Sequence, residues 1–159
     1  MAEAVFVVDA RDLAGLREKL ATGEFALGPA REFVARSAHQ IRAEIVQRTP
    51  VDTGRLRASV AVAIEDQGLT GIIGSNVQYA PHVEFGTRPH FPPPAALQPW
   101  AQRHGFPAGK KGAYLVARAI ARRGTKPRMM FQRGLAAAQP FIDAEARRAL
   151  DEMGQNWQS

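Results

Sequence analysis

Cysteine is absent from this sequence of 159 residues, and its absence excludes several kinds of site. Without a thiol the chain can form no disulfide, no thiolate metal site and no cysteine nucleophile. Long apolar runs are missing too, and none approaches the roughly 18 to 20 residues that a membrane helix needs. The N-terminal MAEAVFVVDARD lacks the basic region, long apolar stretch and cleavage site of a secretion signal. We therefore expect no membrane span and no standard secretion.

Acidic residues are scarce in the second half of the chain. The formal net charge is +6, yet residues 1–100 carry ten Lys/Arg against eleven Asp/Glu, while residues 101–159 carry eleven against four. Such a bias favours a polyanion or an acidic protein surface as neighbour, although a solvated basic face explains it equally well. The densest block has nine basic residues and no acidic one: Arg103, Lys110, Lys111, Arg118, Arg122, Arg123, Lys126, Arg128 and Arg133.

The length and an apolar fraction of 45% suit a single globular domain with a real core. Residues 3–8 read as a short strand, and Asp12 can cap a first helix. The clearest element is an amphipathic helix over residues 29–48, with Pro29 at its start and Pro50 just beyond its end. Its apolar stripe consists of Phe33, Val34, Ala38, Ile41 and Ile45.

A β-hairpin is predicted next, and it is the natural partner for this helix. In residues 58–64 the larger side chains Val60, Val62 and Ile64 alternate with alanines, which predicts a strand with these three toward the core. Residues 66–68 (DQG) read as a turn with glycine in the left-handed position, and residues 69–74 return as the paired strand.

The composition changes beyond residue 86. The run HFPPP at residues 90–94 fits neither a central strand nor a helix interior. We predict a short helix over residues 95–104, with Leu97 and Trp100 buried, and then a flexible basic loop at residues 107–112. A second helix, residues 113–123, is ended by Gly124 and has an apolar side formed by Leu115, Val116, Ala119 and Ile120.

Residues 88–123 therefore read as a helical, proline-rich insertion in one α+β domain spanning residues 1–159. The sequence GTRP at residues 86–89 returns as GTKP at residues 124–127, although four residues do not make a repeat. A C-terminal helix over residues 129–153 is expected to end or kink at Pro140 and to fray after Gly154. Its later stripe is Ile142, Ala146, Ala149 and Met153.

The pattern TPVDTGRLRAS at residues 49–59, then a hairpin, then GSNVQYAPHVEFGT at residues 74–87 resembles a bacteriophage tail-component family. Its members are neck or tail-completion proteins of long-tailed phages, and lambda minor tail protein Z is related to them. The first motif is matched by Pro50, Asp52, Thr53, Gly54, Leu56 and Ser59. The second is matched by Tyr79, Ala80, Glu84, Phe85, Gly86 and Thr87. The late motif is matched only loosely, by residues 129–131 and 134–135.

The resemblance implies a structural virion protein of the head–tail junction, assembling as a six-fold or twelve-fold ring through which the genome passes. Its partners would be its own copies, neighbouring neck and tail proteins, and genomic DNA touched non-specifically by the basic block. It would reside in the virion, and in the host cytoplasm during assembly. The motif residues suit that role: Asp52 and Thr53 as caps, Gly54 and Gly86 as unusual backbone, Tyr79 and Phe85 as packing aromatics.

Catalytic alternatives fit the residues poorly. Asp52-Thr53-Gly54 spells the aspartic-protease triplet, but Pro50, Arg55 and Arg57 surround it instead of apolar strands. His82-x-Glu84 is half of the zinc-deaminase signature, whose other half requires cysteine. The set His82, Glu84, His90 and His104 has no metal-ligand spacing. We expect no catalytic, cofactor-binding or metal-binding residue, and hence no enzyme. The rival hypothesis is a DNA-binding protein using the basic block, non-specific or helix-turn-helix-like.

Overall fold

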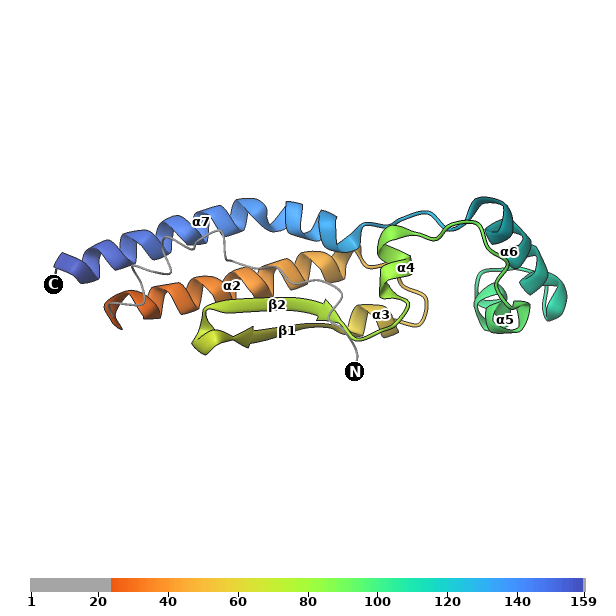
Figure 1. The fold of residues 1–159 in the computed structure, drawn as a ribbon, viewed down its shortest axis with the longest axis horizontal. Helices are drawn as coiled ribbons and strands as arrows, with labels where there is room; N and C mark the ends of the chain where they lie inside the picture. Colours follow the sequence, from red (N-terminus) through yellow and green to blue (C-terminus); the bar gives the residue numbers. More distant parts are fainter. Residues whose placement is uncertain (1–23, 159) are drawn as a thin grey trace.

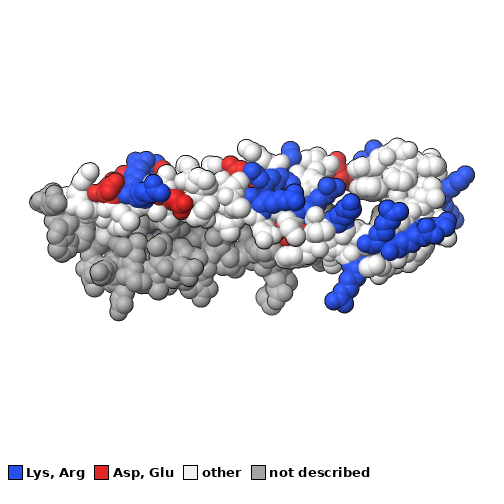
Figure 2. Space-filling model, turned by 90° about the horizontal axis from the view of Figure 1, so that it is seen from above, with Lys and Arg blue, Asp and Glu red and all other residues white. Residues whose placement is uncertain are grey.

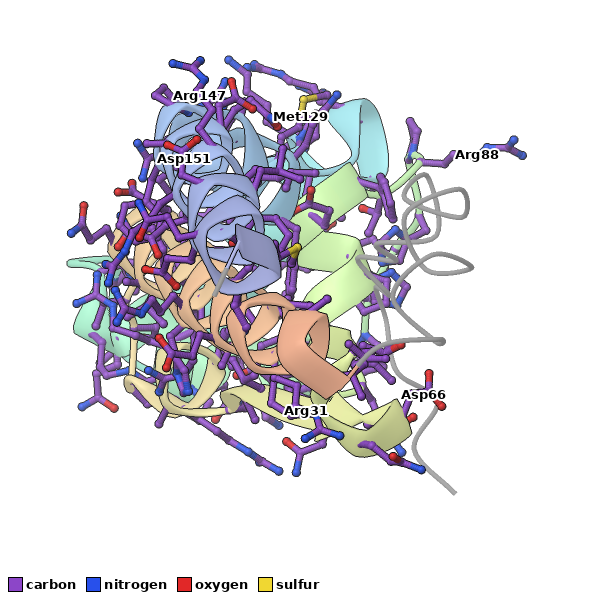
Figure 3. The ribbon with its side chains drawn as sticks, turned by 90° about the vertical axis from the view of Figure 1, so that its left-hand side faces the viewer. Arg31, Asp66, Arg88, Met129, Arg147 and Asp151 are labelled. Carbon is purple, nitrogen blue, oxygen red and sulfur yellow. The ribbon has the colours of Figure 1, made fainter. Side chains whose placement is uncertain are left out.

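The computed structural model describes residues 24–158, with side chains described for residues 26–155. Within them the fold is helix-rich α+β with one antiparallel two-stranded sheet, which confirms the predicted class. Two long helices, α2 (Glu24–Arg48) and α7 (Met130–Gln158), run side by side in opposite directions. Figure 1 shows α2 lying between α7 and the β-hairpin, and Figure 3 shows the same stacking along the helix axes. The strand predicted at residues 3–8 and the helix after Asp12 lie outside the described residues.

The helix α2 forms because its predicted stripe is buried from two sides. Val34, Ala38, Ile41 and Ile45 are all less than a tenth exposed, as the stripe predicts. The two long helices approach most closely where a Cβ at Gly134 would lie 2.5 Å from a side-chain carbon of Ile45. The hairpin also comes close to α2, because a Cβ at Gly71 would lie 3.0 Å from that of Ala38. Glycine at both positions therefore lets three layers share one thin core.

Both prolines in the long helices lie inside them, which corrects the predicted start of a helix at Pro29 and rules out the helix end that was one of two outcomes predicted at Pro140. Pro29 was expected at a helix start, but α2 begins at Glu24, and Ala26 and Ala30 are buried against Ala149 and Met153. Packing before the proline thus outweighs one lost hydrogen bond. Pro140 does not end α7, which continues to Gln158; the proline is exposed, and buried residues before and after it anchor the helix to α2.

The sheet pairs β1 (Val60–Glu65) with β2 (Thr70–Ser75) in a register that sets Val62 opposite Ile73. Val60 is buried and Val62 packs against the main core, as predicted. Ile64 is 41% exposed, contrary to prediction, because it lies beside the turn where the core ends. That turn, Asp66–Gly68, has the expected left-handed glycine at φ 99°.

The main core joins segments from most of the chain. Leu56 from α3 (Arg55–Ala58), Val77, and Ala80 from α4 (Ala80–Phe85) pack with α2, the sheet and α7. We call α2, α3, the hairpin, α4 and α7 the body. Residues 88–123, with α5 (Pro94–Arg103) and α6 (Lys110–Arg123), form an arm. Figure 1 shows the arm at the end of the molecule away from the hairpin turn.

The arm packs through small residues rather than through the large ones predicted. Its buried side chains include Ala101 of α5 and Ala113, Val116 and Ala117 of α6. The predicted face is only partly right: Val116 is buried and Ile120 half-buried. Contrary to prediction, Leu115 is 43% and Trp100 36% exposed, Ala119 is exposed and Leu97 is only half-buried. A Cβ at Gly112 would lie 2.0 Å from the Pro107 carbonyl oxygen, so this close approach selects small residues. The predicted loop at residues 107–112 is correspondingly shorter, because α6 starts at Lys110.

The arm leaves and rejoins the body at a single point, where the two GT sequences pair. Thr87 and Thr125 form an antiparallel bridge, and each backbone N–H donates to the other's carbonyl oxygen at 3.2 Å. Gly86 and Gly124 precede them at φ 71° and 67°. A Cβ at Gly86 would lie 2.3 Å from the Thr125 oxygen, and one at Gly124 would lie 1.9 Å from the Thr87 oxygen. The four-residue echo is therefore the clasp that closes the arm.

The clasp can be tested with a matched pair of glycines. Gly124 (φ 67°, ψ −157°) and Gly109 (φ 73°, ψ −151°) share nearly the same backbone conformation, but a Cβ at Gly109 meets no atom within 4 Å. Both alanine variants carry the same backbone strain. Only Gly124→Ala should also open the clasp, speeding amide hydrogen exchange at Thr87 and Thr125 by about tenfold or more. Equal exchange in the two variants would contradict the steric account.

Candidate functional site

The two sequence motifs meet in the body, beside the base of the arm. In the first motif Gly54 has φ 81° at the start of α3, which is the unusual backbone predicted for it. Leu56 of the same motif is buried. Ser59 then contacts the second motif, because its hydroxyl lies 2.7 Å from that of Ser75. The Ser75 hydroxyl also accepts the backbone N–H of Val77 at 3.2 Å. The motifs are thus one hydrogen-bonded unit around the ends of the hairpin.

Asp52 does not cap α3, contrary to prediction. Its carboxylate instead accepts two hydrogen bonds from Arg103, at 2.7 Å from Nε and 2.5 Å from Nη2. Thr53 makes only a long contact of 3.5 Å with the Arg55 N–H. Since Arg103 ends α5, this pair ties the arm to the body. The Arg103 guanidinium carries a charge and binds a carboxylate more strongly than a backbone amide of α3 would.

The ion pair also sets the protonation of Asp52. The hydrogen bonds from Arg103 lower the pKa of Asp52; partial desolvation opposes them, and the charges of Arg103 and His104 lower it further. The His104 ring nitrogen Nδ1 lies 3.9 Å from the carboxylate. An aspartate held by a guanidinium in this way is an ion-pair partner, not half of a carboxylate dyad that shares a proton.

Glu84 has a role that the sequence reasoning did not find. Its side chain is 1% exposed, and its two carboxylate oxygens accept the backbone N–H groups of Phe131 and Gln132, at 3.0 and 3.2 Å. Its own carbonyl oxygen accepts from Met129 at 3.0 Å. These amides open α7, where they have no partner within the helix and where negative charge is favoured. The motif glutamate is therefore the cap of the C-terminal helix. A lone acid inside the apolar run YAPHVEF was the available signal.

The motif aromatics face outward, contrary to prediction. Tyr79 is 41% and Phe85 63% exposed. The helix α4 is only six residues long, and Ala80, Val83 and Glu84 occupy its inner side. Val77 takes the core position instead. The second motif thus combines a buried cap with exposed aromatic surface.

The predicted basic block lies on the arm and on the first turns of α7. Residues 85–142 contain ten Lys/Arg and no Asp/Glu. Figure 2 shows Lys and Arg gathered over the arm end, with the acidic side chains lying over the body, and Figure 3 shows Arg88 extending away from the body. Arg103 differs from the rest because it is paired with Asp52. The other predicted residues are exposed: Lys110, Lys111, Arg118, Arg122, Arg123, Lys126, Arg128 and Arg133.

The four residues considered as metal ligands, His82, Glu84, His90 and His104, do not form one site. Glu84 is occupied by the α7 amides, while His90 and His104 contact the backbone oxygens of Arg88 and Trp100 at 2.9 Å. Among the described residues, no group of three or more His, Asp or Glu could hold a metal ion. In that same part of the chain, none of the helices is both long and apolar enough to cross a membrane.

The comparison with known families agrees with the geometry. Residues 29–86 match the family described as "Bacteriophage HK97-gp10, putative tail-component", which confirms the resemblance to a phage tail-component family over α2, the hairpin and both motifs. This match does not show a relation to lambda minor tail protein Z. It ends at Gly86, the first residue of the clasp. No curated protein and no solved structure shows a significant match to the chain.

The Glu84 cap can be tested by urea unfolding followed by circular dichroism. Glu84→Ala leaves two amides at the start of α7 without acceptors and should lower the free energy of unfolding by about 2 to 4 kcal/mol. Glu84→Gln retains one acceptor and should cost about 1 to 2 kcal/mol. The control is Glu32→Gln, whose side chain is 63% exposed and whose loss should stay within about 0.5 kcal/mol. A Glu84→Ala variant as stable as this control would refute the cap.

The Asp52–Arg103 pair predicts a pH dependence of the arm's attachment. Because the folded-state pKa of Asp52 is lowered, the pair stabilises above the ordinary aspartate pKa of about 3.9 and is lost as pH falls through the lowered value. In an NMR titration of the Asp52 carboxyl carbon, Arg103→Gln should raise the midpoint toward that ordinary value. His104→Gln should raise it less, because the imidazole is a lesser cause. An unchanged midpoint in Arg103→Gln would show that the pair does not form in solution.

Proposed function

We propose, from the match of residues 29–86 to the HK97-gp10-like tail-component family, that this protein is a structural virion component of the head–tail junction. The geometry supports a structural role for the motif residues. Asp52 joins the arm to the body and Glu84 caps α7. The exposed aromatics of the second motif, Tyr79 and Phe85, offer neighbours the apolar surface typical of interfaces.

The proposed assembly is a ring of copies in the neck, through which the genome passes. The molecule is elongated, and the arm at one end differs in shape from the two long helices that reach the other end (Figure 1). Figure 2 shows Lys and Arg over the arm. A contact between unlike ends is heterologous, and such contacts close into rings when the rotation per copy allows it. Neighbouring neck and tail proteins would bind the faces of this ring.

We also propose that the arm is an inserted module. The family match ends at Gly86, and the chain returns to the same point at Thr125. Among described elements, α5 and α6 pack chiefly on each other. The part of the body that matches the family, residues 29–86, therefore holds its shared structure, and the arm adds to it.

A second candidate function is non-specific DNA contact by the arm. The observation that favours it is the run of ten cations without an acid in residues 85–142. Binding through phosphates would weaken steeply with salt and read no sequence. A helix-turn-helix is less suitable, because residues 104–109 form a longer connection between α5 and α6 than the usual turn of about 3 to 4 residues.

Quantitative mass spectrometry of purified particles, scaled to the major tail subunit, tests the proposed function. We expect a small, fixed copy number consistent with one ring. Absence from finished particles would overturn the virion role. Titration of duplex DNA at increasing salt would then decide whether the arm serves the second function, with affinity falling linearly on a log–log scale.

A further inference from the structure

The outward face of α6 is exposed to solvent. Lys111, Leu115, Arg118 and Arg122 follow the i, i+4, i+7, i+11 spacing of one helix face, and Tyr114 borders it. Tyr114 is 52% and Leu115 43% exposed, and the three cations are exposed as well. In the described part of the chain none of these cations forms an ion pair. The face thus carries an apolar centre between unpaired positive charges.

This composition fits a protein better than duplex DNA. A phosphate backbone is recognised by cations and polar groups and offers no apolar surface to Leu115. A protein interface has an apolar core with a charged rim, and Tyr and Arg are enriched in it. The partner surface should therefore present an exposed apolar side chain beside unpaired acids.

The hairpin tip of the same protein has these features. Ile64 is 41% exposed, and Glu65 and Asp66 beside it are exposed. Within the described residues neither acid forms an ion pair, whereas Glu32, Glu145 and Glu152 on the long helices pair with Arg36 or Arg148. Arg31 packs against the turn at Gly68 and reduces the net negative charge there. Because the negative charge alone is modest, the exposed Ile64 matters as the apolar part of this surface.

We propose that the outward face of α6 in one copy binds the hairpin tip of the next copy. Figure 1 shows the hairpin turn and α6 well apart along the long axis of the molecule, so within one chain the two surfaces cannot meet. Contact between them in successive copies is head-to-tail, and it would supply the ring interface. The inference rests on the proposed function, because it takes the assembling partner to be a second copy.

Paired charge variants of the full chain test this contact by sedimentation velocity. Variant A is Arg118→Glu with Arg122→Glu, and variant B is Glu65→Lys with Asp66→Asn. Asparagine is chosen because Asp66 has φ 49°, a conformation that asparagine tolerates. Alone, each variant places like charges together, and its self-association constant should weaken by about tenfold or more. Mixed in equal amounts, A and B can alternate with opposite charges at every contact, so association should return.

The control is Arg55→Glu with Arg147→Glu, which changes the net charge as variant A does but alters exposed arginines of the body. It should associate like the wild type, and circular dichroism should show the same helix content in all variants. A wild type that stays monomeric, a variant A that associates normally, or an A and B mixture that stays apart would each overturn the contact. So would loss of DNA binding in variant A with self-association intact. If particles still contain a fixed copy number, the virion role survives that failure.

Discussion

The structure depends on the buried carboxylate of Glu84, which accepts the backbone N–H groups at the start of α7. A helix of 29 residues begins immediately after an irregular connecting segment. The backbone N–H of Phe131 in its first turn is buried, where water cannot accept its hydrogen bond. One buried side chain from α4 provides both acceptors, at sequence separations of 47 and 48. The same residue's carbonyl oxygen fixes Met129, which sits at φ 51°. The family's second motif and the C-terminal helix are therefore one structural unit, although they are far apart in sequence.

The parts of the fold that follow from local rules were predictable. The stripe of α2, the pairing of the two hairpin strands and the left-handed Gly68 all depend on spacing of 3.6 or 2 residues or on one glycine, and the structure bears them out. The helix start expected at Pro29 and the helix end considered at Pro140 do not occur. Each proline removes a single hydrogen bond, and packing against a second long helix outweighs that loss. Periodicity cannot reveal that partner.

The candidate site was predicted less well, for a different physical reason. Polar side chains form hydrogen bonds with groups that are near in space, whatever their distance in sequence. Asp52 accepts from Arg103, and Glu84 accepts from the α7 amides. Tyr79 and Phe85 were expected to pack from the family resemblance, but Ala80, Val83 and Glu84 occupy the inner side of α4 and leave both aromatics exposed. In the arm the close approach at Gly112 favours alanine over leucine, so the larger side chains of α6 are left outside.

The clasp between Thr87 and Thr125 has a consequence for the history of such chains. Because the segment between them starts and ends at adjacent points, its length is nearly independent of the geometry that holds it, and the entropy of closing a longer loop grows only slowly. A segment of this kind behaves as an exchangeable cassette. The segment can therefore change in length or sequence while the helices and hairpin beneath keep their packing, so surface chemistry can change without a new fold.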